Sequence, residues 1–155
     1  MQELLLQVLE RFTDRLIKRQ REMYATDVPF IEKWRAAMRF LDEDAASGYS
    51  KVWYELQALG WNDPNIRKRV AQVDYGWRRV VTEAFDRAMD EYGIDRKRYP
   101  LDGIVTLVAT FNIGMHLEIL SGIRSGHRDL LDLCDRTLAE LEARKRSRTT
   151  KPKVP

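Results

Sequence analysis

Apolar residues recur three or four positions apart through most of the chain, and this spacing predicts an all-α fold with six helices. The predicted helices, in chain order, cover residues 2–23, 28–47, 49–59, 64–92, 100–123 and 127–146. In the first of them the apolar stripe is expected to run through Leu5, Val8, Leu9, Phe12 and Leu16. The connections are short, as in a compact helical bundle, so residues 1–146 are expected to form a single domain.

The longest predicted helix has marked ends. Asp63 can accept hydrogen bonds from the first turn, and Pro64 suits the first helical position. Gly93 is placed to end the same helix. Gly76 lies in its middle, where glycine costs about 1 kcal/mol relative to alanine. A closely packed neighbour or a bend is expected at that point.

Residues 104–123 form an apolar run with Glu118 as its only charged side chain. A run of this length is long enough to cross a bilayer. Asn112, His116 and Glu118 would be costly in hydrocarbon, so a buried helix is expected instead and no membrane contact. A helix that is apolar nearly all round needs cover on every side. A second subunit is the expected cover on one side, and a pocket or the core on the other.

Small residues along one side of this run would let another helix approach closely, and the last predicted helix offers a matching apolar face. These two faces predict a homodimer. The residues expected in its interface are Thr110, Gly114, Leu117, Ser121, Leu130, Cys134, Thr137 and Leu141. The alternative is that the two faces meet inside one chain.

A second set of residues, beside the small stripe and on the predicted third and fourth helices, is expected to line a ligand pocket. Asn112 and His116 lie one turn apart and would be polar points in an otherwise apolar cavity. The full set is Trp53, Trp77, Phe111, Asn112, Met115 and His116. For each of these residues the alternative is plain core packing, and for His116 a hydrogen-bonded core histidine. The many aromatic residues favour an apolar or aromatic effector.

Composition fits a soluble globular protein, with 44% hydrophobic and 33% charged residues in 155. The formal net charge is +3, but the last twelve residues carry six Lys or Arg and no acid, which leaves a net charge of −3 for the rest. The body therefore shows no basic face for nucleic acid. Residues 147–155 are expected to form a disordered basic tail, either solvated or in weak contact with phosphate.

Cys134 is the single cysteine and is expected to be a buried thiol. The first residues are amphipathic and contain no cleavage region of a signal peptide, which favours a cytoplasmic location. The sequence has two histidines, no repeated Glu-x-x-His pairs and no phosphate-binding glycine loop. It therefore gives no support for a metal site, a cofactor or catalysis. The chain is therefore not expected to be an enzyme.

Several short motifs occur in a recognisable order between residues 52 and 142. They are Val-Trp-Tyr-Glu-Leu at 52–56, Asn-Asp-Pro at 62–64, Ile-Arg-Lys-Arg-Val at 66–70, Tyr-Gly-Trp-Arg-Arg-Val-Val at 75–81, Ala-Met-Asp-Glu-Tyr-Gly at 88–93 and Val-Ala-Thr-Phe-Asn-Ile-Gly-Met-His-Leu at 108–117. In this order the region resembles the C-terminal effector-binding and dimerisation domain of TetR-family transcriptional regulators. Gly114 stands where such proteins often have a glycine.

The resemblance implies a ligand-sensing, dimerising domain of a bacterial-type transcription regulator that binds a small hydrophobic or aromatic effector. Such regulators also carry an N-terminal helix-turn-helix head, and Met1 falls about where the effector domain would start. This chain alone is therefore not expected to bind DNA sequence-specifically. The alternative function is an orphan helical-bundle interaction module without a ligand.

Overall fold

The computed structural model describes residues 2–149, which form six α-helices and no strand. The helices are α1 (Gln2–Tyr24), α2 (Phe30–Ala46), α3 (Tyr49–Gly60), α4 (Pro64–Tyr92), α5 (Leu101–Leu120) and α6 (His127–Thr149). The all-α fold expected from the sequence is confirmed. The tail was expected to begin at residue 147, but α6 continues to Thr149, and the rest of that tail lies outside the described residues.

Local sequence explains both ends of α4. The Asp63 carboxylate accepts hydrogen bonds from the backbone N–H groups of Asn65 and Ile66, at 2.8 and 3.3 Å. These two groups lack partners within the helix, so the cap stabilises its first turn. At the other end Gly93 adopts a φ of 65°, a left-handed conformation that suits glycine.

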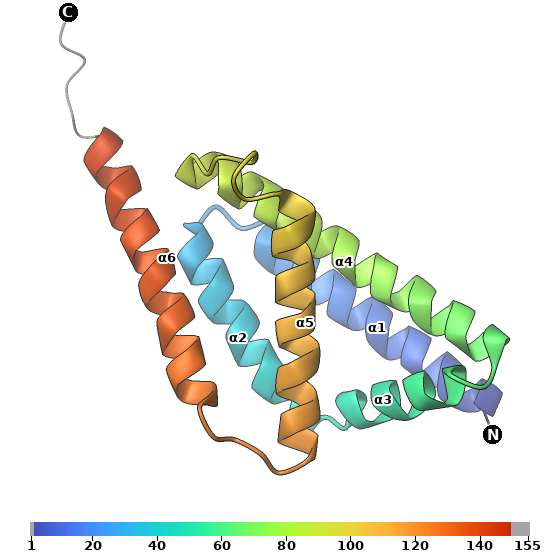
Figure 1. The fold of residues 1–155 in the computed structure, drawn as a ribbon. Helices are drawn as coiled ribbons and strands as arrows, with labels where there is room; N and C mark the ends of the chain where they lie inside the picture. Colours follow the sequence, from blue (N-terminus) through green and yellow to red (C-terminus); the bar gives the residue numbers. More distant parts are fainter. Residues whose placement is uncertain (1, 150–155) are drawn as a thin grey trace, which may run out of the picture.

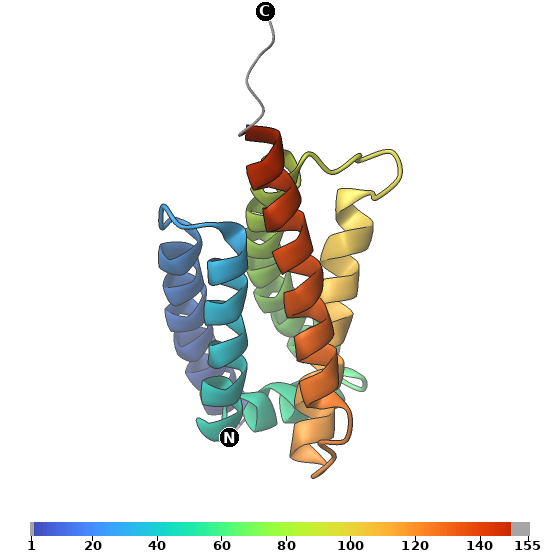
Figure 2. The ribbon, with the colours of Figure 1, turned by 90° about the vertical axis from the view of Figure 1, so that its left-hand side faces the viewer.

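Five of the helices run roughly along the length of the bundle, and α3 crosses one end of it (Figures 1 and 2). α4 is the central element, since α1, α3, α5 and α6 all pack against it. α6 lies against α2 and α4, where Arg35 on α2 forms a two-point ion pair with Asp135 at 2.7 and 3.0 Å. α5 lies against α4, α2 and α3.

The hydrophobic core consists of two separate clusters of buried residues. One joins the C-terminal part of α1 to α2 and to the second half of α4, and consists of Tyr24, Phe30, Trp34, Val80, Ala84, Ala88 and Tyr92. The other joins the N-terminal part of α1 to α3 and the start of α4, and consists of Leu6, Leu9, Trp53, Leu56, Ile66 and Val70. The middle turns of α1 and α4 lie between these clusters.

The inward face of α1 includes Leu9, as expected, but not Val8 or Phe12. Val8 and Phe12 are exposed, and the buried side runs through Leu6, Leu9 and Thr13. The expected stripe contains apolar residues alone, whereas the buried face includes a polar residue. The hydroxyl of Thr13 is accommodated because it donates to the backbone carbonyl of Leu9 at 2.8 Å.

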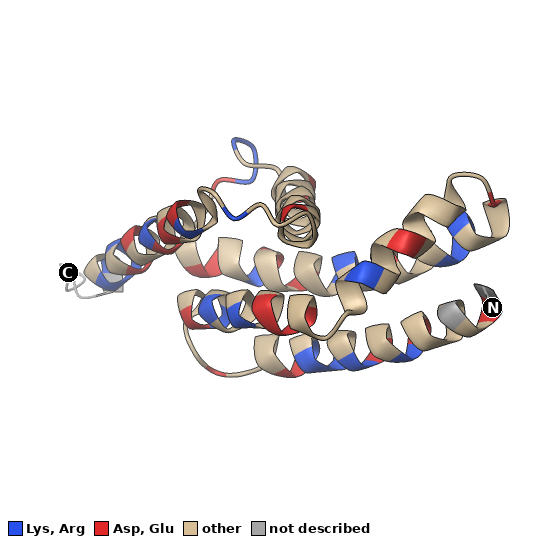
Figure 3. Ribbon diagram, turned by 90° about the horizontal axis from the view of Figure 1, so that it is seen from below, with Lys and Arg blue, Asp and Glu red and all other residues tan. Residues whose placement is uncertain are grey.

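The apolar helix α5 is covered on one side only. Figure 3 shows it end-on with few charged residues, whereas α1 and α6 carry Lys, Arg, Asp and Glu along their length. By length and composition alone α5 is long and apolar enough to cross a membrane, a property that core helices of soluble proteins share. Its contacts with three neighbouring helices make it part of the bundle.

Candidate functional site

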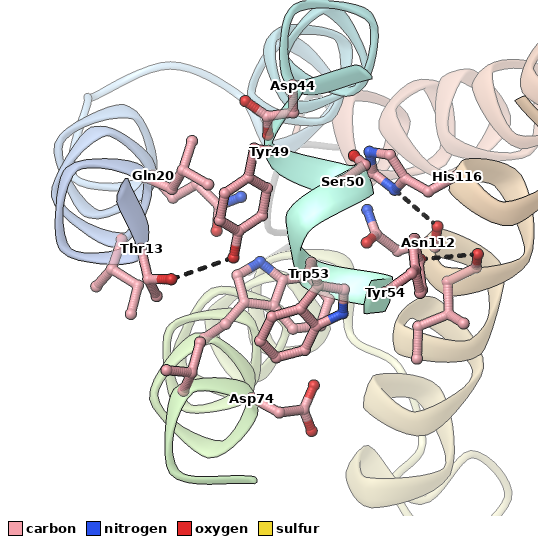
Figure 4. A pocket seen from close by; sticks show the side chains of 15 residues that line it. Thr13, Gln20, Asp44, Tyr49, Ser50, Trp53, Tyr54, Asp74, Asn112 and His116 are labelled. Carbon is pink, nitrogen blue, oxygen red and sulfur yellow. Dashed lines mark hydrogen bonds between the residues drawn. The ribbon is translucent and has the colours of Figure 1, made fainter. Parts of the chain in front are cut away.

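A cavity of about 80 Å³ lies between the two core clusters (Figure 4). The middle turns of α1 and α4 form two of its walls, from Thr13 to Gln20 and from Val73 to Trp77. α3 and α5 form the others, and Asp44 near the end of α2 completes the lining. The cavity therefore separates the two clusters, and Trp53 of one cluster forms part of its wall.

His116 is the more deeply buried of the two polar side chains of α5 that line this cavity, and it is 7% exposed. Its Nδ1 lies 2.9 Å from the backbone carbonyl of Asn112. A carbonyl oxygen only accepts, so Nδ1 carries a proton, and in the tautomer protonated on Nδ1 alone Nε2 is an acceptor. None of the described residues forms a hydrogen bond with Nε2, which is buried. A buried acceptor without a partner is costly, and it marks His116 as a candidate contact.

The hydroxyl groups of two tyrosines of α3 donate hydrogen bonds to other atoms of the protein. Thr13 donates to Leu9, so Tyr49 is the donor in its 3.2 Å hydrogen bond to the Thr13 hydroxyl. Tyr54 donates to the backbone carbonyl of Ile113 on α5 at 3.1 Å. Burial raises the pKa of both Tyr49 and Tyr54 to about 12, so both are neutral at physiological pH. They fix the geometry of the wall.

The two carboxylates of the lining are both ion-paired. Asp44 accepts from Arg19 at 2.7 Å, and Asp74 accepts from Arg78 at 2.6 Å. Burial raises the pKa of Asp44 above its usual value, although the hydrogen bond from Arg19 opposes this shift. Among the described residues that line the cavity, none is Lys or Arg. The site is thus close to electrically neutral and rich in acceptors.

The structure brings together four of the six residues expected in a ligand pocket: Trp53, Trp77, Asn112 and His116 line the cavity. Phe111 does not line the cavity. It packs against the core cluster that contains Trp34, and the centroids of these two rings are 6.3 Å apart. Met115 is buried but lies outside the cavity lining.

The contributions of α1 and α2 to the cavity were missed from the sequence, which pointed to α3, α4 and α5. Thr13, Gln20 and Asp44 look like ordinary polar residues of amphipathic helices. The available signal was the helical phase of Leu6, Leu9 and Thr13, which share one face of α1 three or four residues apart. Bulkier residues on the neighbouring face concealed it.

The expected dimer residues divide into two groups. Thr110, Gly114 and Leu117 on α5 and Ser121 directly after it are all exposed, as are Leu130 and Thr137 on α6. Cys134 and Leu141 instead pack against the core cluster of their own chain. Leu107, Leu120 and Leu133, which were not expected there, are also exposed.

Within residues 2–149 no group of three or more His, Cys, Asp and Glu side chains is arranged to hold a metal ion. His127, the second histidine, is paired with Glu118 near the connection between α5 and α6, and neither residue lines the cavity.

No protein-family model matches the chain, and comparisons with curated proteins and with solved structures found no match.

Proposed function

We propose that this chain is the ligand-sensing and dimerisation domain of a TetR-like transcription regulator, and that it binds a small hydrophobic or aromatic effector. In this proposal the domain is a cytoplasmic homodimer and has no catalytic role. The order of sequence motifs between residues 52 and 142 supports the family, and the six-helix arrangement is compatible with it.

The observation that carries the proposal is the division of α5 into two faces. The inner face, formed by Val105, Ala109, Asn112 and His116, is turned toward the bundle and places its polar members at the cavity. The outer face consists of Leu107, Thr110, Gly114, Leu117 and Ser121 and is exposed. One helix therefore joins a candidate ligand site to a candidate subunit interface.

This arrangement offers a simple route for coupling. A ligand that enters between the two core clusters touches α1, α3, α4 and α5 together. Gly76 of α4 lies close to α1, where a Cβ would be 3.4 Å from the Ile17 side chain, so α1 and α4 are in near contact beside the cavity. A ligand that changes the distance between α1 and α4 would also shift α5. Ligand binding and subunit arrangement would then influence each other reciprocally.

DNA binding is not part of the proposal for this chain alone. Outside the last twelve residues the net charge is −3, so binding by the basic tail would be weak and would fall steeply with salt. Tight binding to one duplex over scrambled competitors at physiological salt would contradict this part of the proposal.

The ligand-binding half is tested by filling the cavity. Val73 lines it, so Val73→Phe should occupy the space that a ligand needs. Small aromatic compounds that raise the melting temperature of the wild type should have no such effect on this variant. Val28→Phe is the matched control, since Val28 is exposed and distant from the lining. Equal stabilisation of all three proteins would show that the cavity is not the site.

The alternative proposal is an orphan helical-bundle interaction module without a ligand. The exposed apolar face of α5 supports that role equally well. It would be favoured if the protein dimerises and no small molecule stabilises it.

A further inference from the structure

Two buried hydrogen-bond acceptors on the cavity wall have no partner among the described residues. Nε2 of His116 and Oε1 of Gln20 are both buried, both belong to lining residues, and neither has a partner among the described residues. They come from α5 and α1. The carboxylates of Asp44 and Asp74 add further acceptor oxygens. A ligand that carries a hydrogen-bond donor can satisfy one of these two unpartnered acceptors.

Positive charge on the wall is already paired or absent. Arg19 and Arg78 hold the two carboxylates, and the lining itself includes no Lys or Arg. The hydroxyl groups of Tyr49 and Tyr54 donate to protein oxygens. An anionic ligand would therefore lose its hydration without gaining a cationic partner, which is strongly unfavourable. A cationic ligand would find no unpaired carboxylate.

The rest of the lining combines aromatic rings with the aliphatic side chains of Leu16, Ile17, Val73 and Ile113. Tyr49, Trp53, Tyr54 and Trp77 contribute rings, and those of Tyr49 and Trp53 are stacked at 6.4 Å with an interplanar angle of 17°. The volume of about 80 Å³ is roughly half of the ~150 Å³ that admits benzene in an engineered protein core. A small planar ring matches this space best, and a larger ligand must displace side chains.

We propose that the cavity selects a small aromatic molecule carrying an uncharged N–H or O–H group, which donates to Nε2 of His116, and that it discriminates against anions. This inference rests on the proposed ligand-binding function, and it adds the chemical class of the ligand and the residue that determines it. His116 is the specificity-determining residue because its other nitrogen is held by the Asn112 carbonyl, which fixes Nε2 as the acceptor.

The test compares pyrrole, furan and pyrrole-2-carboxylate, each titrated into the full chain and followed by NMR. Pyrrole and furan have nearly the same shape, but only pyrrole carries an N–H donor. Pyrrole should bind about fivefold more tightly than furan, as expected for one additional hydrogen bond. Pyrrole-2-carboxylate should bind more weakly than pyrrole. In ¹⁵N-labelled histidine spectra, pyrrole should shift the Nε2 resonance of His116, and furan should leave it nearly unchanged.

His116→Phe keeps a planar ring and removes the acceptor, so this variant should bind pyrrole and furan equally. If the variant does not fold, the ligand preference and the Nε2 shift of the wild type decide alone. Equal binding of pyrrole and furan to the wild type, tighter binding of the carboxylate, or an unchanged preference in His116→Phe would overturn the inference and leave the cavity as a ligand site. If neither neutral ring binds, both the inference and the proposed ligand-binding function are wrong.

Discussion

The two faces of α5 differ less in polarity than those of an ordinary amphipathic helix. The polar side chains of Asn112 and His116 are turned toward the bundle, and His116 is almost fully buried. The outer face combines small residues with leucines, of which Leu107 is 70% and Leu117 44% exposed. Hydrophobicity normally decides which face is covered, so the exposed leucines and the buried His116 support the proposal that the outer face meets a second subunit and the inner face a ligand.

Covering the outer face of α5 would contribute more free energy than satisfying its inner face. Burying a leucine side chain stabilises a protein by roughly 1.5–3 kcal/mol relative to leaving it in water. A second copy that covers Leu107, Leu117 and Leu120 on each chain would gain this stabilisation several times over. Gly114 lies at the centre of the same face and would let the two helices approach closely. The inner face needs only one small donor to satisfy His116.

The largest expected effect comes from placing a charge on the outer face. Leu117→Lys would put one lysine from each subunit into the interface, and the dissociation constant should rise more than a hundredfold. Light scattering after size exclusion should then give the mass of one chain at micromolar concentration. Leu59→Lys is the matched control, since Leu59 is 38% exposed and lies on α3 outside this face. If Leu59→Lys also dissociates the dimer, or if Leu117→Lys leaves it intact, the outer face is not the interface.

The second prediction separates core packing from ligand contact. Phe111 packs on the core cluster and does not line the cavity, so Phe111→Ala should cost about 3 kcal/mol of stability. Chemical denaturation measures this loss. The extra stabilisation by a cavity ligand should nevertheless equal that of the wild type. A selective loss of ligand stabilisation in this variant would place Phe111 in the site after all.

The third prediction uses two glycines of α5 with equal space around them. A Cβ added to Gly103 or to Gly114 meets nothing within 4 Å in the single chain. Gly103→Ala should therefore stabilise the protein by about 0.5–1 kcal/mol, as expected for alanine in a helix. Gly114→Ala should instead weaken dimerisation, because the added methyl group separates the two subunits. Equal stabilisation by both substitutions, with no change in the dissociation constant, would argue against close packing at Gly114.

The smallest expected effect compares two aspartates with opposite pKa shifts. Burial raises the pKa of Asp44 at the cavity, and the hydrogen bond from Arg35 lowers the pKa of Asp135 between α2 and α6. The contribution of Asp44 to stability is greatest in acid and is lost as pH rises above the ordinary aspartate value of about 4. The contribution of Asp135 is present above about pH 4 and is lost as pH falls.

Asp44→Asn should therefore gain stability relative to the wild type as the pH increases from about 4 to about 6. Asp135→Asn should be less stable than the wild type at about pH 6, and the difference should shrink toward about pH 3. Urea denaturation across this range measures both variants. If the two substitutions change the free energy of unfolding in parallel across this pH range, the two carboxylates do not have opposite pKa shifts.

The parts of the fold that were predicted correctly depend on local signals. Asp63, Pro64 and Gly93 define α4 through capping and backbone conformation, which a short stretch of sequence contains. The position of Asn112 and His116 on the cavity side of α5 follows from their spacing of one helical turn. In each case the deciding interaction lies within about four residues.

The parts that were missed depend on packing between distant segments. Phe111 adjoins Asn112 on the helix, and only the position of Trp34 on α2 decides that it belongs to the core. Cys134 and Leu141 face inward because α6 packs on α2 and α4, which helical phase alone does not specify. The inward turn of Thr13 likewise depends on where Tyr49 lies. Such residues lie at the border between the two faces of a helix, and tertiary contacts decide which of these faces includes them.

Native mass spectrometry of the freshly purified chain tests most directly whether α5 connects a ligand cavity to a subunit interface. The wild type should show twice the mass of the 155-residue chain at micromolar concentration, and Leu117→Lys should show the single-chain mass. Added pyrrole should bind with one molecule per subunit, and Val73→Phe should abolish that addition. A monomer mass for the wild type at every concentration, or unchanged ligand addition in Val73→Phe, would contradict the account.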